Sequence, residues 1–325
     1  MFPRVSMFTL LVVLIVPLVM AQEPVDQVMG NWEGKFTSGG WESKTLSAKI
    51  VAEGKDSYRA LIEIGTTSSD LMTTEVMGIG QKKNGAFCGI AKELPGAPTI
   101  IAEALLSKMA GKIVGPDQTI NFEMGRVEKK SPTLGAPAPQ GAVALLEGNN
   151  LEPWKIIPGN IVDGVLHIGG NTFITKQEVG DHKLHVEFRT PFMPNERGQA
   201  RGNSGVYVQG RYEVQVLDSF GLPAADNECG GIYKKAVPKV NACLPPMEWQ
   251  TYDITFYAPK FNDSGKKTKD AEITVEQNGI VIHDHVKLDG VTPGGVSDTE
   301  GKTGPLLLQN HGNPVQYRNL WIQPL

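Results

Sequence analysis

Hydrophobic and polar residues alternate with a period of two along much of the chain, a pattern typical of β-strands whose two faces meet different surroundings. In residues 183–189, the apolar Leu184, Val186 and Phe188 would face one way and the polar residues between them the other. Strands of this kind are expected at residues 31–37, 44–52, 57–64, 119–127, 249–257, 271–277, 280–285, 306–310 and 315–322. With 37 Gly and 22 Pro to supply turns, the pattern predicts an all-β protein.

The stretch 202–221 predicts two short strands joined by a tight turn at Gly210-Arg211. In both strands the valines fall on one face, which we expect to lie against a core. The opposite face carries a phenol, amides and an acid, the groups that grip a hydroxyl-rich ligand: Tyr207, Gln209, Glu213 and Gln215. The alternative is a solvated sheet face with no ligand.

The order of these segments divides the chain in two. Residues 22–130 predict a small antiparallel β domain, in which residues 100–109 could be a short helix or a strand. The tripeptide Gly30-Asn31-Trp32 also opens lipocalin-like barrels, but it is too short to fix a topology. Residues 131–141 (SPTLGAPAPQG) have the composition of a semi-extended linker. Residues 142–325 contain around ten short strands and predict a β-sandwich of the jelly-roll type.

The first residues predict a secretory signal. Arg4 precedes an apolar run at residues 7–20, and the small Ala21 follows it. The run is short for a membrane span and Pro17 interrupts it, so we expect cleavage after Ala21, secretion or a periplasmic location, and no membrane span in the mature chain.

An exported protein can keep disulfides. Cys229 and Cys243 flank a turn-rich loop and are the expected pair, whereas Cys88 lies in a strand-like run and is expected to be a buried thiol. The formal net charge of −4, without a basic cluster, argues against a nucleic-acid partner.

Several short motifs in residues 142–325 resemble one known family. They are residues 145–148 (LLEG), 184–189 (LHVEFR), 202–207 (GNSGVY), 212–218 (YEVQVLD), 231–233 (GIY), 248–252 (EWQTY), 304–312 (GPLLLQNHG) and 317–322 (YRNLWI). In this order they resemble the 3-keto-disaccharide hydrolase domain family. The resemblance implies a concanavalin-like jelly roll that acts on 3-keto-glycosides, and it does not extend to residues 22–130.

A ketone at sugar C3 acidifies the neighbouring C2–H, so a base can start an elimination that expels the C1 substituent, and water then adds back. This chemistry needs a general base, an acid for the leaving group and a donor for the oxyanion. Glu213 is the first candidate for acid–base work and Glu187 the second; His311 and Arg318 are the other catalytic candidates. The expected sugar-hydroxyl partners are Asn203, Tyr207, Gln215, Tyr233 and Gln309.

Three questions stay open at this level. A divalent metal ion could polarise the ketone, and His283 and His285 share a predicted strand face, but an exposed face explains that pair as well. The enzyme interpretation predicts that Glu213, Gln309, His311 and Arg318 meet in a single cleft. The alternatives are a carbohydrate-binding module without catalysis and a surface interaction domain.

Overall fold

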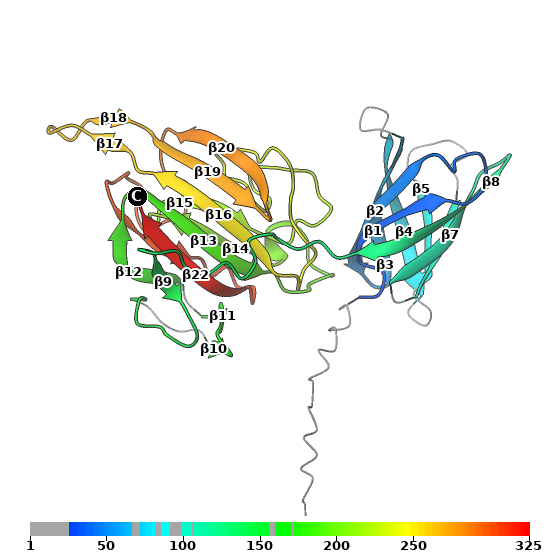
Figure 1. The fold of residues 1–325 in the computed structure, drawn as a ribbon, viewed down its shortest axis with the longest axis horizontal. Coiled ribbons are helices and arrows are strands. Elements are labelled where there is room, and N and C mark those ends of the chain that lie inside the picture. The colour runs from blue at the N-terminus through cyan, green and yellow to red at the C-terminus, as the bar shows by residue number, and fades with distance from the viewer. Residues whose placement is uncertain are drawn as a thin grey trace, which may run out of the picture.

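The structure is a computed structural model that describes residues 26–66, 72–81, 86–91, 99–105, 107–155, 160–170 and 172–325. The expected signal sequence lies outside these residues, and so does the side chain of Cys88. Figure 1 shows two β-rich parts, a barrel built from the first strands and a sandwich built from the later ones, joined by one extended segment.

The first part is a closed barrel of eight strands, in which each strand pairs antiparallel with the next and β8 pairs with β1. The strands are β1 (Gly30–Phe36), β2 (Thr45–Gly54), β3 (Ser57–Gly65), β4 (Met72–Gln81), β5 (Ala86–Ala91), β6 (Thr99–Leu105), β7 (Lys108–Val114) and β8 (Thr119–Val127). Residues 100–109 therefore contribute to β6 and β7, and the helix considered for them does not form. Closure removes the free edges that an open sheet would expose.

Inward-facing apolar side chains fill the barrel. On β2, Leu46, Ala48 and Ile50 are all buried and belong to one apolar cluster. Trp32 on β1 is fully buried and its indole N–H donates a 2.8 Å hydrogen bond to the carbonyl of Val28. The guanidinium of Arg126 lies 4.8 Å from the centre of the Trp32 ring, so the last strand covers the residue that the first strand buries.

The second part is a two-sheet sandwich, as the alternation predicted. The larger sheet has the strand order β10-β11-β22-β13-β16-β19-β20, with β9 also paired to β22. Its strands are β9 (Val143–Leu146), β10 (Asn160–Val162), β11 (Val165–His167), β13 (His182–Arg189), β16 (Gln250–Tyr257), β19 (Ala271–Gln277), β20 (Ile280–Leu288) and β22 (Gln316–Pro324). The smaller sheet, in the order β12-β21-β14-β15, consists of β12 (Phe173–Val179), β14 (Ser204–Val208), β15 (Tyr212–Val216) and β21 (Gly304–Leu308). A separate hairpin pairs β17 (Lys260–Phe261) with β18 (Lys267–Lys269), and one 3-10 turn, η1 (Gly198–Ala200), precedes β14.

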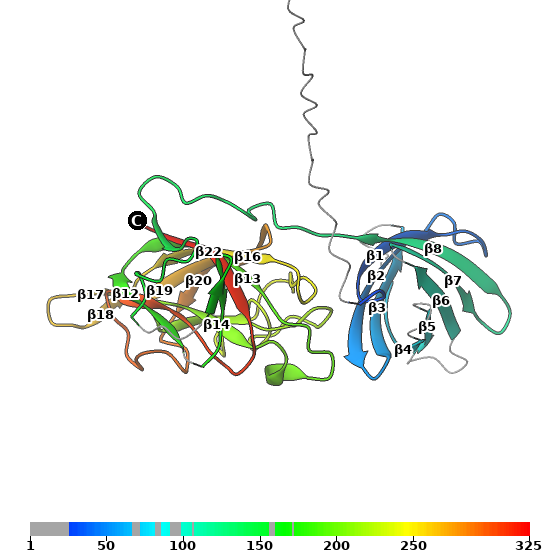
Figure 2. The same cartoon turned by 90° about the horizontal axis from the view of Figure 1, so that it is seen from below.

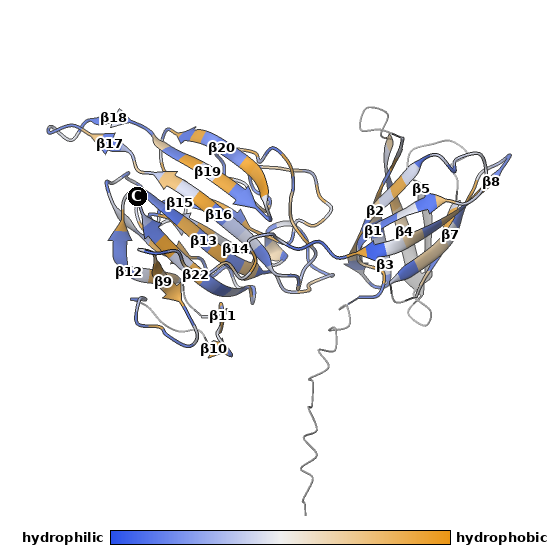
Figure 3. Cartoon of the chain, viewed as in Figure 1, coloured by the Kyte–Doolittle hydropathy of each residue, from blue (hydrophilic) through white to orange (hydrophobic). Residues whose placement is uncertain are grey.

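The core lies between these two sheets. Leu184, Val186 and Phe188 of β13 face Val206 and the other apolar residues of the smaller sheet within one buried cluster, which confirms the predicted alternation. Figure 3 shows the resulting bands of hydrophobic and hydrophilic residues along the strands. Each sheet consequently presents a second, polar face on the outside of the sandwich.

The segment after the barrel packs against the sandwich instead of hanging free between the two parts. Figure 2 shows it running from β8 across the larger sheet. Ser131 is 5% exposed and its hydroxyl lies 2.6 Å from that of Thr251 on β16. The carbonyl of Ala136 accepts hydrogen bonds from Asn319 and Trp321 of β22. The segment therefore covers the outer face of the larger sheet.

The expected disulfide is not found. Cys229 and Cys243 are both buried free thiols that interact with each other and belong to the sandwich core. The Cys229 thiol lies 3.3 Å from the phenol oxygen of Tyr252, and the amide of Gln277 donates to its sulfur. The two cysteines lie close together as predicted, but they contribute to the core as two small apolar side chains and not as a disulfide. In the described part of the chain, no helix is both long and apolar enough to cross a bilayer.

Candidate functional site

Two buried polar clusters lie on opposite outer faces of the sandwich. The first surrounds Glu213 on β15 of the smaller sheet, and the second surrounds Glu187 on β13 of the larger sheet. The shared apolar core, to which the neighbours Val214 and Val186 belong, separates them. The two clusters therefore have to be judged separately as sites.

The cluster around Glu213 is a chain of hydrogen bonds across three strands. Tyr207 on β14 is directly opposite Glu213 in the register, and its phenol donates a 2.7 Å hydrogen bond to the Glu213 carboxylate. Gln309, which follows β21, donates from its amide nitrogen to the Tyr207 oxygen over 3.1 Å. Gly205 leaves the space that the carboxylate occupies, because a Cβ there would lie 2.4 Å from Glu213 Oε1.

Burial gives Glu213 an unusual proton affinity. The carboxyl group is 2% exposed, and this desolvation raises its pKa to about 7, against the hydrogen bond from Tyr207, which lowers it. Burial, together with the Glu213 charge and hydrogen bond, raises the pKa of Tyr207, so the phenol stays protonated. A carboxyl group that is half ionised near neutral pH is suited to both accepting and donating a proton.

A loop covers this pair. The Glu213 backbone N–H donates to the hydroxyl of Thr292, and the Tyr207 oxygen lies 3.0 Å from the carbonyl oxygen of Pro293. Gln309 and Tyr233 are the partly exposed members of the cluster.

Three amide side chains form a second polar group beside Glu213. Gln215 lies two residues along the same strand and on the same face, about 7 Å away, and its amide nitrogen donates to Gln199 Oε1 over 3.1 Å. Asn203 donates to the backbone carbonyl of Gln199 over 2.8 Å. The side-chain oxygens of Asn203 and Gln215 are buried and lack a hydrogen-bond partner among the described residues. Two unpaired acceptors in one place suit a ligand that presents hydroxyl groups.

The cluster around Glu187 has a different character. Its carboxylate accepts a 2.6 Å hydrogen bond from Arg318, a 2.9 Å hydrogen bond from Asn319 and a further bond from the backbone N–H of Gly135. His185, stacked on Trp321 at 5.2 Å between ring centres, lies 3.6 Å from the same carboxylate. The predicted meeting of Arg318 with Glu213 in one cleft is therefore wrong: Arg318 pairs with Glu187 on the other side of the core.

The charges in this second cluster are fixed at neutral pH. Burial opposes ionisation of Glu187, but hydrogen bonds from His185, Asn319, Gly135 and Arg318 outweigh it and lower its pKa to about 2. Burial likewise lowers the pKa of His185, yet the carboxylates of Asp253 and Glu187 outweigh it and raise the pKa to about 9. A low pKa for Glu187 and a high pKa for His185 suit an ion pair better than proton transfer near pH 7.

His311, the predicted catalytic histidine, lies on the loop that follows Gln309. His311 is exposed on the loop between β21 and β22 and makes no hydrogen bond or ion pair within the described part of the chain. Two residues later, the side chain of Asn313 accepts a hydrogen bond from the backbone N–H of Asn203, so this loop borders the amide group.

His283 and His285 do not share a face. His283 is 2% exposed and donates to the carbonyl of Gly230, whereas His285 is exposed beside Asp284. The pairing of β20 with β19 shifts register between Val275 and Ile273, which breaks the alternation there. Over the described residues, no group of three or more His, Cys, Asp or Glu side chains is arranged to hold a metal ion.

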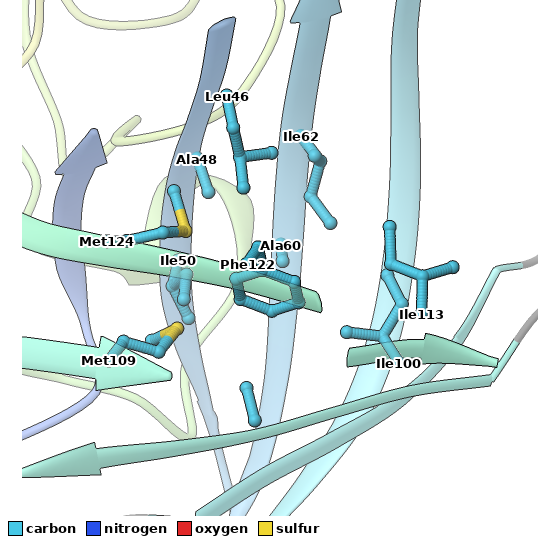
Figure 4. Close-up of a pocket in the computed structure, with 11 residues that line it drawn as sticks. Leu46, Ala48, Ile50, Ala60, Ile62, Ile100, Met109, Ile113, Phe122 and Met124 are labelled. Atoms are coloured by element: carbon cyan, nitrogen blue, oxygen red, sulfur yellow. The ribbon is translucent and has the colours of Figure 1, made fainter. Parts of the chain in front are cut away.

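The cavity that the described barrel residues enclose has an apolar lining. Figure 4 shows apolar side chains from the barrel strands, among them Ile50, Phe122 and Met124, directed toward one another. They leave a cavity of ≈ 20 Å³, and every side chain that lines it is apolar. This is space for about one water-sized group, without a polar atom to orient it.

Comparisons with known proteins add what geometry alone does not supply. The profile of the 3-keto-alpha-glucoside-1,2-lyase-like domain family matches residues 141–323. The chain belongs to this family. Like its relatives it is carbohydrate-active, and it has the β-sandwich that the motifs implied. No curated protein matches the chain.

Solved structures resemble a little more than half of the chain. A candidate glycosyl hydrolase from Parabacteroides distasonis is 36% identical, with a TM-score of 0.54, over 58% of this chain and 86% of that one. A second candidate glycosyl hydrolase from this organism is 23% identical over 57% of this chain and 99% of that one, with a TM-score of 0.43. A third is 19% identical over 57% and 94%, with a TM-score of 0.43.

The alternation of apolar and polar residues did not identify several residues of the site. Gln199 belongs to a 3-10 turn, and Thr292 and Pro293 to a long loop, so none of them lies in an alternating segment. Asp253 was within a predicted strand, but its contact with His185 at 2.6 Å depends on the pairing of β13 with β16. Only the pairing of strands far apart in sequence could have revealed these neighbours.

Proposed function

We propose that this protein cleaves 3-keto-glycosides by removing the C2 proton, eliminating the C1 substituent and adding water, with Glu213 as the proton carrier. The observation that carries the proposal is the buried Glu213 carboxyl group, which Tyr207 and Gln309 join in a chain of hydrogen bonds and whose pKa burial raises to about 7. The family to which the chain belongs supports the substrate class.

The reaction balances on the groups present. The Glu213 carboxylate takes the C2 proton, and the electron pair of that bond forms a C2–C3 double bond as the ketone oxygen becomes an oxyanion. Collapse of this enolate re-forms the C3 ketone and makes a C1–C2 double bond as the C1–O bond breaks, and the departing oxygen takes a proton from water. The hydroxide of that water adds to C1, while C2 regains a proton from Glu213.

Neighbouring side chains have roles that match these steps. Gln309 and Tyr233 are partly exposed N–H and O–H donors beside Tyr207, suited to the oxyanion. The unpaired acceptors of Asn203 and Gln215 suit the hydroxyls of the glycoside. Glu187 and Arg318 take no part, because the core separates them from Glu213.

The test is incubation of the full chain with 3-keto-trehalose or a methyl 3-keto-glucoside, for wild type and Glu213→Gln. We expect turnover by wild type and a loss of about a thousandfold in Glu213→Gln, the middle of the range for one acid–base group. Running both with and without a chelator separates a metal-dependent reaction from one that needs only these side chains. Binding without turnover under every condition would favour a carbohydrate-binding module, whose acceptors at Asn203 and Gln215 the structure also contains.

A further inference from the structure

We propose that the barrel is part of the sugar site, because it holds the loop that carries Gln199 and Asn203 through the buried guanidinium of Arg201. The proposal rests on the proposed function, since it assigns those amides to substrate binding. It gives the barrel a role, although every side chain that lines its described cavity is apolar.

Arg201 joins three separate pieces of the chain. Its side chain is 5% exposed and donates a 2.7 Å hydrogen bond to Asp218, just after β15. A second nitrogen donates over 3.2 Å to the carbonyl of Ala52 on β2 of the barrel. The backbone of Arg201 also pairs with Asp218, whose N–H donates to the Arg201 carbonyl over 3.1 Å. This one side chain therefore ties the loop to both the sandwich and the barrel.

Two of the three amide side chains beside Glu213 lie next to Arg201 in the sequence. Gln199 lies two residues before Arg201 and Asn203 two residues after it, and Asn203 donates to the Gln199 carbonyl. Gln199 in turn accepts from Gln215, which belongs to the sheet and is fixed. A shift of Arg201 would consequently move two of the three amides relative to the third.

The barrel meets this loop over a packed surface. Val51 points away from the barrel interior, between the inward-facing Ile50 and Ala52, yet it is only 1% exposed. A Cβ on Gly221 would lie 2.7 Å from the Val51 side chain, so the sandwich loop covers it. The loop between β13 and β14, residues 190–203, carries Gln199 and Asn203 and is called the site loop. Phe192, near its start, packs against the barrel's apolar cluster.

Charged contacts surround this apolar centre. Arg197 on the site loop donates to the backbone carbonyl of Glu53 over 2.6 Å and pairs with its carboxylate. Arg59 of β3 pairs with the same carboxylate at 3.2 Å and donates to the carbonyl of Gly221 over 2.8 Å. The close fit extends to Gly54, where a Cβ would lie 2.1 Å from the Asn195 side chain.

The tests perturb the interface from each side. Val51→Lys places a charge in the buried contact beside Arg59, and Arg197→Ala removes the partly exposed bonds to Glu53 while it leaves both cores intact. Ser47→Lys is the matched control, because Ser47 lies on the same strand and the same outward face, where it bonds Glu63. We measure hydrogen exchange of the backbone amides at residues 198–203, together with kcat and KM on a methyl 3-keto-glucoside.

We expect faster exchange at residues 198–203 in Val51→Lys and Arg197→Ala, and unchanged exchange in Ser47→Lys. KM should rise about tenfold in Val51→Lys, with kcat changed by less than about twofold, because the amides bind substrate and Glu213 carries the proton. Arg201→Lys should reproduce this rise in KM. A lysine can keep the ion pair with Asp218, but it lacks the planar guanidinium that also donates to the Ala52 carbonyl.

Unchanged exchange and unchanged KM in folded Val51→Lys, Arg197→Ala and Arg201→Lys would overturn the proposal, as would a loss confined to kcat. If no variant, wild type included, turns over a 3-keto-glycoside, the proposed function fails, and the exchange measurement still decides whether the barrel orders the loop.

Discussion

The phenol of Tyr207 donates a 2.7 Å hydrogen bond to the carboxyl group of Glu213, directly opposite it on the neighbouring strand. Burial raises the pKa of this carboxyl group to about 7, and the Tyr207 bond limits the rise by stabilising the ionised form. Glu213 can therefore carry a proton near neutral pH, and the hydrogen bond from Tyr207 helps to set its pKa.

Tyr207→Phe should make Glu213 a poorer base at neutral pH. Without the donor, the pKa of Glu213 rises further, so less carboxylate is present at pH 7. In the wild type kcat/KM should increase as pH rises through about 7, and in the variant this increase should occur at higher pH. The pH dependence of kcat/KM for both proteins is the measurement. A variant curve that keeps the wild-type midpoint would mean that Tyr207 does not control this carboxyl group.

Glu213 should also make stability depend on pH. Its folded pKa of about 7 lies above the ordinary 4.5, so its contribution is complete below 4.5 and is lost as pH rises through 7. Glu213→Gln cannot ionise, and it should gain stability relative to wild type over this range, by up to about 3 kcal/mol. Urea unfolding of both proteins at pH 5 and pH 8.5 measures the change. An equal difference at the two pH values would refute the raised pKa.

Glu187→Ala should affect stability more than catalysis. The substitution removes the acceptor shared by Arg318, Asn319 and Gly135 and leaves the buried His185 with Asp253 alone, which costs about 3 kcal/mol. Because the core separates Glu187 from Glu213, kcat/KM of the folded variant should stay near the wild-type value. Thermal unfolding and initial rates at a temperature where both proteins are folded give the two numbers. A large loss of kcat/KM without a loss of stability would return Glu187 to the active site.

The sequence predicted which residues share a strand face better than it predicted which of these faces lie close together. Alternation placed Glu213 and Gln215 opposite the core-facing Val214, as the structure has them. The same rule placed Glu187 away from the core. Alternation alone does not say on which of the two sheets an outward-facing residue lies, because the strands of both sheets alternate in the same way. Choosing between them requires the strand order, which depends on contacts between distant segments. For this reason the pairing of Arg318 with Glu213 failed, while that of Tyr207 with Glu213, across a short hairpin, could be found.

The barrel and the thiol pair illustrate two other limits of the sequence. Alternation indicated strands in the first part, but closure depends on β1 meeting β8, about ninety residues later, through hydrogen bonds that leave no periodic signal. Cys229 and Cys243 do come together, yet both stay thiols in the sandwich core. Spacing predicted their proximity and could not predict the bond.

Gln215→Met should weaken binding without destabilising the free protein. The Gln215 oxygen is buried without a partner, so its removal relieves a desolvated acceptor and offsets the lost hydrogen bond to Gln199. A sugar hydroxyl, in contrast, would lose its acceptor. We expect KM to rise about tenfold while the midpoint of thermal unfolding stays the same or increases. Gln209→Met is the control, because the Gln209 amide donates to Val179 and Lys302 away from the amide group. A similar KM for Gln215→Met and wild type would exclude Gln215 from the sugar site.

We propose that the chain is exported, on the strength of the apolar run at residues 7–20 and the small residue that follows it. Expression of the full sequence in a host with a secretion system should give a mature protein that begins at Gln22. Intact mass and N-terminal sequencing check the cut. A protein that keeps residues 1–21 would contradict the prediction.

The most direct test of Glu213 as a proton carrier is the reaction of a methyl 3-keto-glucoside in D₂O. Elimination followed by hydration returns a proton from solvent-exchanged Glu213 to C2, so the 3-keto-glucose that wild type releases should carry deuterium at C2. Glu213→Gln should release labelled product about a thousandfold more slowly. 3-Keto-glucose incubated without enzyme gives the background exchange. Released product without deuterium at C2 above this background, together with an equal rate for substrate deuterated at C2, would contradict the account, because the C1–O bond would then have broken without removal of the C2 proton.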